Sequence, residues 1–184
     1  DRLTDASGSG LKSAEWYYGP QKKLLAVYSL EKENVFYNTD FKLDAGYQNT
    51  EESRHNRNFG NYNLQNRVEK VSVYSLAANF ETKLKKGNLY YGIENYYDDL
   101  KSTAHKNNIN TGIIAPLDTR YPNGKNNMMR NDVYISYSSK RDEATNFSMG
   151  ARVGYAQLES TIADNTIFPL PFTEIKQQNF TYSG

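Results

Sequence analysis

The chain has 184 residues, 16 of them tyrosine, and a formal net charge of +1. A balanced charge gives no electrostatic reason to expect nucleic-acid binding, and the absence of cysteine excludes disulfides and thiolate metal sites. Mean hydropathy is −0.82, and no apolar run approaches the ~20 residues of a membrane helix, which excludes a helical membrane protein. A membrane β-barrel stays compatible, because its lumen-facing residues and loops keep the average hydropathy low.

The first part of the chain predicts two short segments and then two longer strands. Residues 1–10 are rich in Gly, Ser and Asp and predict a loop. Residues 12–18 predict a short strand, which Gly19-Pro20 ends. Alternating apolar side chains predict strands over 22–32 and from residue 39 onward, with a turn at Glu33-Asn34. The second strand carries its apolar side chains on one face: Phe41, Leu43, Ala45 and Tyr47.

From residue 49 to residue 66 the alternation dissolves into Glu, Asn, Arg and His. This composition predicts a long polar loop, carried partly on strand extensions. Strand pairing is expected to resume around Arg67. Lys85-Lys86-Gly87-Asn88 predicts a tight turn, because Gly and Asn tolerate a positive φ.

The second half repeats the pattern with a longer interruption. Residues 101–130 contain Pro and Gly breakers and a run of Asn, and predict the longest connection. A strand restarts at residue 133, residues 140–146 predict a short turn, and residues 163–178 predict another loop. Between them, residues 147–155 alternate strictly between apolar and small or polar side chains, which gives a strand with one apolar and one polar face.

The connections alternate in length along the chain. Short ones are expected near 32–38, 84–88 and 139–146, and long ones near 1–22, 49–66, 101–130 and 160–178. This rhythm predicts an all-β antiparallel meander. It is typical of a transmembrane β-barrel with short periplasmic turns and long extracellular loops. Since six or seven strands cannot close a wide barrel, the chain would be an arc of a larger one, or a small barrel with a packed interior.

The two predicted faces fit this environment. Aromatic side chains lie on the apolar face toward strand ends, as in the aromatic girdles of membrane barrels; ordinary cross-strand pairs in a soluble sheet are the alternative. These side chains are Tyr28, Tyr47, Tyr74, Tyr97, Tyr137, Phe147 and Tyr155. The polar face suits a water-filled or plugged lumen, or the solvent side of a soluble sheet. It carries Lys42, Asp44, Gln48, Asn79, Glu81, Glu94 and Arg152.

Four segments, in chain order, resemble the barrels of TonB-dependent outer-membrane receptors of the Bacteroidetes type. They are residues 14–21, 47–57, 118–124 and 150–153. The resemblance implies a ~22-stranded barrel in the bacterial outer membrane, closed by an N-terminal plug, with residues 1–184 as its middle part. It also implies import of a metal chelate driven through TonB, which the missing N-terminal part would contact. Outer-membrane lipids and a surface lipoprotein are further partners it implies.

The densest polar cluster, residues 51–57, supplies three candidate ligand-binding residues. Arg54 and Arg57 are able to grip a carboxylate or phosphate in bidentate fashion, and His55 to ligate haem iron or another metal. The favoured alternative is a solvated strand top whose charges pair with neighbours or with the plug. A period of two places Arg54 on one face and His55 and Arg57 on the other.

Four more loop residues are candidates for ligand contact. Arg120 and Tyr121 belong to a predicted turn, and a loop that folds on itself explains them better than ligand contact does. Trp16 could stack on a flat ligand, and inter-loop packing explains it about as well. His105 is more simply a solvated loop histidine. We expect no resident metal or cofactor and no catalysis, because the chain has no Cys, no HExxH and no Gly-x-Ser-x-Gly.

The sequence therefore predicts an outer-membrane transporter of a scarce nutrient complex, with an iron-siderophore or haem first and cobalamin as another possibility. Two alternatives remain: a structural or assembly component of an outer-membrane complex on the same barrel, and a soluble β-rich glycan-binding module.

Overall fold

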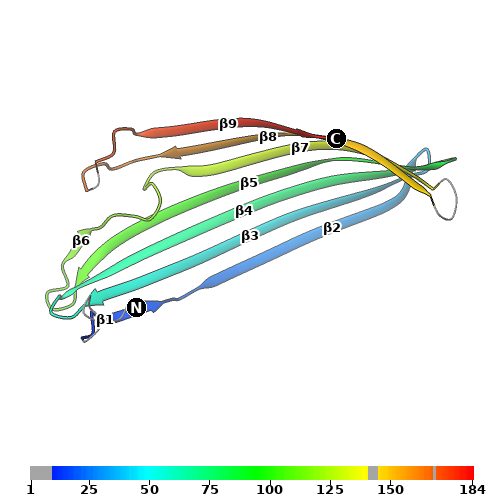
Figure 1. The fold of residues 1–184 in the computed structure, drawn as a ribbon. Coiled ribbons are helices and arrows are strands. Elements are labelled where there is room, and N and C mark those ends of the chain that lie inside the picture. The colour runs from blue at the N-terminus through cyan, green and yellow to red at the C-terminus, as the bar shows by residue number, and fades with distance from the viewer. Residues whose placement is uncertain (1–9, 141–144, 168) are drawn as a thin grey trace.

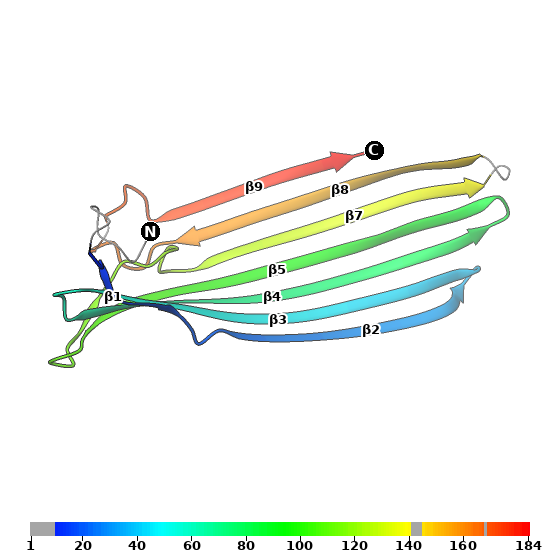
Figure 2. The same cartoon turned by 60° about the horizontal axis from the view of Figure 1, so that its bottom comes forward.

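The computed structural model describes residues 10–140, 145–167 and 169–184. Strands make up 76% of these residues, no helix occurs among them, and so none is present that could cross a membrane. The strands are β1 (Ser13–Tyr18), β2 (Lys22–Phe36), β3 (Thr39–Asn58), β4 (Asn63–Leu84), β5 (Gly87–Asn108), β6 (Ile114–Pro116), β7 (Asn126–Lys140), β8 (Asn146–Thr161) and β9 (Glu174–Ser183). They form one curved layer (Figures 1 and 2).

The sheet is an antiparallel meander, as the connection lengths predict. Its order is β1-β3-β4-β5-β7-β8-β9, with β2 following β1 along the same edge of β3, and β6 lying beside β5. The sheet is not closed: β2 forms one outer edge and β9 the other. Figure 2 shows that these two edge strands run in the same direction.

Tight turns join the strands at one end of the sheet, which we call the turn end. Tyr37 and Asn38 have φ values of 42° and 56°, as a two-residue type I′ hairpin turn requires. The turn predicted at Glu33-Asn34 is therefore wrong, since β2 continues to Phe36. Asn34 lies where the register between β2 and β3 shifts, between Lys32 and Phe36. The predicted turn at Lys85-Lys86 is confirmed. Most of the predicted turn 140–146 falls outside the described residues.

The opposite end, which we call the loop end, differs more from expectation. The long loop predicted over 49–66 is wrong, because β3 and β4 stay paired from Thr50 with Val71 to Asn56 with Gln65. Only residues 59–62 connect them. Polar side chains line both faces of this extension, so its hydrophobic pattern is lost while the backbone ladder continues. The long connections are 109–125, which includes β6, and 162–173. β9 begins at Glu174, inside the predicted loop 163–178.

The cross-strand register gathers apolar side chains into a continuous apolar face. Its central row crosses the whole sheet and consists of Leu30, Leu43, Ala78, Ile93, Val133, Val153 and Tyr182. Aromatic rows lie on either side of this row. The aromatic row nearer the turn end consists of Phe41, Phe80 and Tyr91, and the ring centroids of neighbours in it are 4.9 and 5.2 Å apart. The aromatic row nearer the loop end consists of Tyr47, Tyr74 and Tyr97, and the ring centroids of neighbours in it are 5.1 and 6.3 Å apart.

The other face, which we call the polar face, carries hydrogen-bonded charges. Arg152 on β8 reaches across β7 to Glu94 at 2.6 Å and also contacts Asp132 at 3.2 Å. Tyr134 donates to the Asn79 carbonyl oxygen at 2.7 Å. Its ring lies over Gly92, where an added Cβ would come within 2.9 Å of it. Glycine therefore lets the Tyr134 ring lie flat across the neighbouring strand.

No apolar side chain is buried among the described residues. Ile93, Val133 and Val153 in the central apolar row are 52%, 59% and 58% exposed. Within these residues the sheet has no second layer, so its apolar face is free to meet another phase or another chain.

Candidate functional site

The extension of β3 and β4 at the loop end positions two arginines directly opposite one another on the polar face. Arg54 pairs with Arg67 across the strands, and Tyr18 on β1 pairs with Arg54 from the other side. Like charges in such positions destabilise a sheet unless anions lie near. The turn over residues 59–62 sets this register, because it brings the two polar strand tops back on each other.

Aromatic rings complete one wall of the site. Trp16 and Tyr18 lie on the same side of β1, two residues apart, with their rings edge to face at 5.2 Å. The Arg54 guanidinium carbon lies 5.1 Å from the centre of the Tyr18 ring, within the range of a cation–π contact. Both rings therefore belong to the same surface as the arginines.

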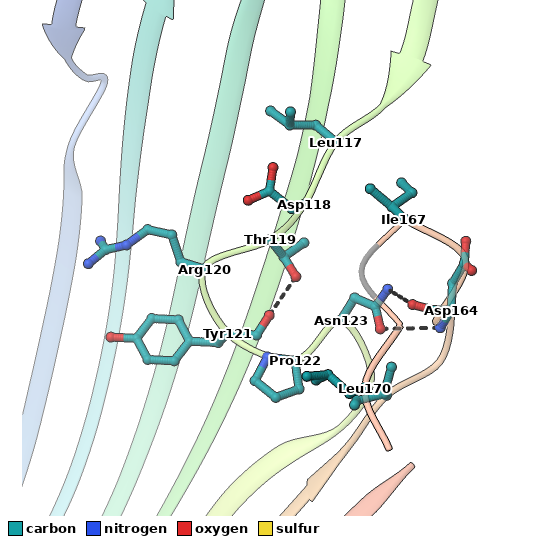
Figure 3. Close-up of a pocket in the computed structure, with 11 residues that line it drawn as sticks. Leu117, Asp118, Thr119, Arg120, Tyr121, Pro122, Asn123, Asp164, Ile167 and Leu170 are labelled. Carbon is teal, nitrogen blue, oxygen red and sulfur yellow. Dashed lines mark hydrogen bonds between the residues drawn. The ribbon is translucent and has the colours of Figure 1, made fainter. Parts of the chain in front are cut away.

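The connection 117–123 folds over the polar face and supplies the third arginine. Arg67 donates to the Asp118 carboxylate at 3.0 Å and to its carbonyl oxygen at 3.2 Å. The Tyr121 amide lies 3.5 Å from the Ser102 hydroxyl on β5. These contacts hold the connection that carries Arg120 against the polar face of β4 and β5. Figure 3 shows Arg120 and Tyr121 extending away from Asp164.

A cavity of about 220 Å³ lies among the three arginines and the rings of β1, and its lining is completed by Tyr17, His55 and Asn56. We call the set of Trp16, Tyr18, Arg54, Arg67 and Arg120 the arginine–aromatic cluster. Two carboxylates accompany its three guanidinium groups: Asp118 on Arg67, and Glu52, 3.9 Å from Arg54. The Arg54 Nε is buried without a hydrogen-bond partner among the described residues. The cluster thus has cationic donors to spare beside two aromatic rings, which suits a ligand that combines an acidic group with a flat one.

A second contact surface joins the two longest connections. The Asn123 side chain donates to the Asp164 carbonyl oxygen at 2.8 Å and accepts from the Asp164 amide at 3.2 Å (Figure 3). It also accepts from the Ala163 amide at 2.9 Å. The Thr119 hydroxyl donates to the Tyr121 carbonyl oxygen at 2.5 Å. The loop that presents Arg120 is therefore fastened both to itself and to its neighbour.

His55 lies on the opposite side of the sheet from Arg54, as the period of two predicts. Its Nδ1 lies 2.6 Å from the Asn66 carbonyl oxygen, and its Nε2 lies 2.9 Å from the Gly19 carbonyl oxygen. The ring also stacks on Tyr17 at 4.6 Å. Both ring nitrogens are engaged by neighbours, so the geometry does not present His55 to a metal ion.

Arg57 and His105 are also outside the cluster. Arg57 donates to Glu15 at 2.7 Å and to the Asn61 carbonyl oxygen at 3.0 Å. These contacts fit the alternative in which the charges of the strand top pair with their neighbours. His105 pairs with Asn66, which separates it from His55. The described residues contain no group of three or more His, Cys, Asp or Glu that could hold a metal ion.

Of the seven sequence candidates, the structure brings Trp16, Arg54, His55 and Arg120 to the lining of one cavity, and the Tyr121 ring lies beside Arg120. His55 borders this cavity although both of its ring nitrogens contact neighbouring residues. Sequence reasoning missed Arg67 as a site residue. The signal was the Gly60-Asn61 dipeptide: a tight turn centred there would have placed Arg67 opposite Arg54.

The geometry defines the class of the chain as all-β, with one open antiparallel sheet that has unlike faces. No protein-family model, curated protein or solved structure matches the chain.

Proposed function

We propose that the sheet is an arc of a transmembrane β-barrel in the bacterial outer membrane, and that the protein is a TonB-dependent importer of a scarce anionic nutrient complex. The observation that carries the proposal is the exposed apolar face between two aromatic rows. An apolar band with aromatic girdles at both of its edges is the pattern that a barrel presents to lipid.

The dimensions support this placement. Phe41 and Tyr47 in the two aromatic rows are six residues apart on β3, or about 20 Å along the strand. The charged network around Arg152 lies on the other face, where a lumen would solvate it or pair it with a plug. The edge strands β2 and β9 run in the same direction, so an antiparallel barrel needs further strands between them.

The arginine–aromatic cluster supports binding of an anionic ligand. It lies on the proposed lumen side, at the end with the long connections, which in such barrels faces outward from the cell. Haem offers carboxylates beside a flat ring, and many iron-siderophore complexes offer acidic and aromatic groups. These two are therefore the first candidates, and cobalamin, which carries a phosphate, follows.

Uptake and binding measurements on the full-length protein test the proposal. We expect deletion of its gene to abolish growth on one iron chelate, haem or cobalamin under limitation. We expect Arg54→Gln with Arg120→Gln to weaken binding of that ligand about 10- to 100-fold, since a hydrogen bond to a charged group contributes about 1.5–3 kcal/mol. Arg57→Gln, which makes the same kind of substitution once on the other face, is the control and is expected to bind normally.

Unchanged uptake of every candidate ligand after deletion would overturn the transport proposal. If surface assembly of an outer-membrane complex failed instead, the structural alternative would hold. Recovery of the protein in the soluble fraction would favour the soluble binding module. Equal ligand affinity in the double variant and the Arg57→Gln control would remove the cluster from the binding site.

A further inference from the structure

Lysines gather on the same side of the sheet as the apolar face, just beyond its loop-end aromatic row. Lys22, Glu51, Lys70 and Lys101 are successive cross-strand neighbours on β2, β3, β4 and β5. We call these four residues the lysine row. The three lysines are exposed, and two of them, Lys70 and Lys101, lie directly opposite each other.

The charges of the lysine row are not balanced. Glu51 binds Lys22 at 3.0 Å and Lys70 at 2.9 Å, and these two ammonium groups hold the pKa of Glu51 below its usual range, with Lys70 the larger cause. Lys101 has no ion pair with a described residue, although Asp99 precedes it by two residues on the same face. The row thus contains three lysines and one carboxylate, which pairs with two of them.

The neighbouring lysines differ in this respect. Lys125 and Lys176 share Glu159, at 2.9 and 3.6 Å, and Lys176 also pairs with Glu174 at 2.8 Å. Positive and negative charges are equal there. The excess of positive charge on this side of the sheet is therefore localised to the strands β2 to β5.

The height of the row above the aromatic row is that of a lipid headgroup. Tyr47 and Glu51 are four residues apart on β3 and face the same way, which is about 13 Å along the strand. With a strand tilt of about 40°, this is roughly 10 Å along the membrane normal. The Tyr97 hydroxyl accepts a hydrogen bond from Asn127 at 3.2 Å, so the polar zone begins directly beyond the rings.

We infer that the lysine row binds the phosphate groups of an anionic lipid whose acyl chains lie along the apolar face. The inference rests on the proposed membrane placement and adds a specific lipid contact to it. A lipid phosphate between Lys70 and Lys101 relieves the repulsion of the two opposed ammonium groups. It also supplies the negative charge that the row lacks, with the apolar face extending below it for the acyl chains.

The test uses the full-length protein in lipid nanodiscs of phosphatidylcholine, with and without phosphatidylglycerol as the anionic lipid. Retained lipid is counted by native mass spectrometry. Near an anionic surface each lysine changes affinity about 5-fold, so Lys22→Gln, Lys70→Gln and Lys101→Gln combined are expected to weaken retention of phosphatidylglycerol roughly 100-fold. Lys23→Gln with Lys106→Gln alters lysines on the polar face and is expected to retain it.

Equal retention by the triple variant and the polar-face control would overturn the inference while leaving membrane insertion intact. Failure of the unaltered protein to enter nanodiscs would instead overturn the proposed function, and the inference with it. Inorganic phosphate separates the two sources of the anion: the inference expects no displacement of lipid by phosphate in solution, and full displacement would show a free-phosphate site.

Discussion

Two arginines that face each other show how single residues define the candidate site. Arg54 and Arg67 belong to strand tops whose sequence is polar throughout, and neither is exceptional in its own segment. Cross-strand pairing places them side by side, and Asp118 then binds only one of them. Arg54 has only the more distant Glu52, at 3.9 Å, so it is better able than Arg67 to take an outside anion.

Asp164 is the residue on which the joined loops should respond to acid. The hydroxyl and the amide of Thr166 hold the pKa of the Asp164 carboxyl below its ordinary value of 3.8. A depressed pKa in the folded state contributes stability that is present above pH 4 and lost as the pH falls through the lowered value. We therefore expect the protection factor of the Thr166 amide, which is its exchange rate corrected for the intrinsic rate at each pH, to fall below about pH 4.

Asp164→Asn should remove this acid response, because the side chain no longer titrates. An equal protection factor of the Thr166 amide at pH 2 and pH 6 in the unaltered protein would contradict the role of the carboxylate.

At the scale of elements, different interactions determine the hairpin turn between β2 and β3 and the polar extension of β3 and β4. The β2–β3 turn needs two left-handed residues, and Asn38 suits this better than Tyr37 does. The β3–β4 extension has no hydrophobic alternation, and it is held by its backbone ladder and by side-chain contacts such as Asn49 with Ser72 at 2.9 Å. Polar composition alone therefore does not distinguish a loop from a strand that meets water on both faces.

Replacing Tyr37 by Asn should stabilise the turn. Tyr37 has φ 42° and its side chain is 93% exposed, so the change relieves backbone strain and removes little packing. We expect a gain of about 1 kcal/mol in the free energy of unfolding, measured by urea denaturation. Tyr37→Val, which is β-branched, is the control and should destabilise the protein; a loss of stability in both variants would contradict the turn geometry.

At the scale of the whole molecule, the sheet has two unlike faces, and the part of the chain that the structure describes has no buried apolar core. A soluble sheet of this size would bury its apolar face against a second layer, and none exists among the described residues. The exposed central row and the ion network around Arg152 therefore face different surroundings. The proposed barrel would satisfy both faces at once, with lipid on one side and a polar lumen on the other.

Two adjacent alanines test this division. Ala78 lies in the central apolar row between Leu43 and Ile93, and Ala77 lies on the polar face between Asp44 and Glu94. We expect Ala78→Lys to destabilise the membrane-inserted protein by about 2–4 kcal/mol, because a lysine then meets the bilayer midplane. Ala77→Lys, next to two carboxylates, should change stability little. Equal effects of the two variants on folding into lipid vesicles would contradict a lipid-facing apolar face.

Most of the strand order was predictable from the sequence alone, because alternation at a period of two and residues that favour turns act locally. Leu43, Ala45 and Tyr47 identify their face without any knowledge of neighbouring strands, and Lys85-Lys86-Gly87 identifies its turn. Only the tertiary structure decided that residues 49–58 are strand and that Arg67 lies opposite Arg54. These features depend on register across strands, and a polar segment carries no hydrophobic pattern from which register could be inferred.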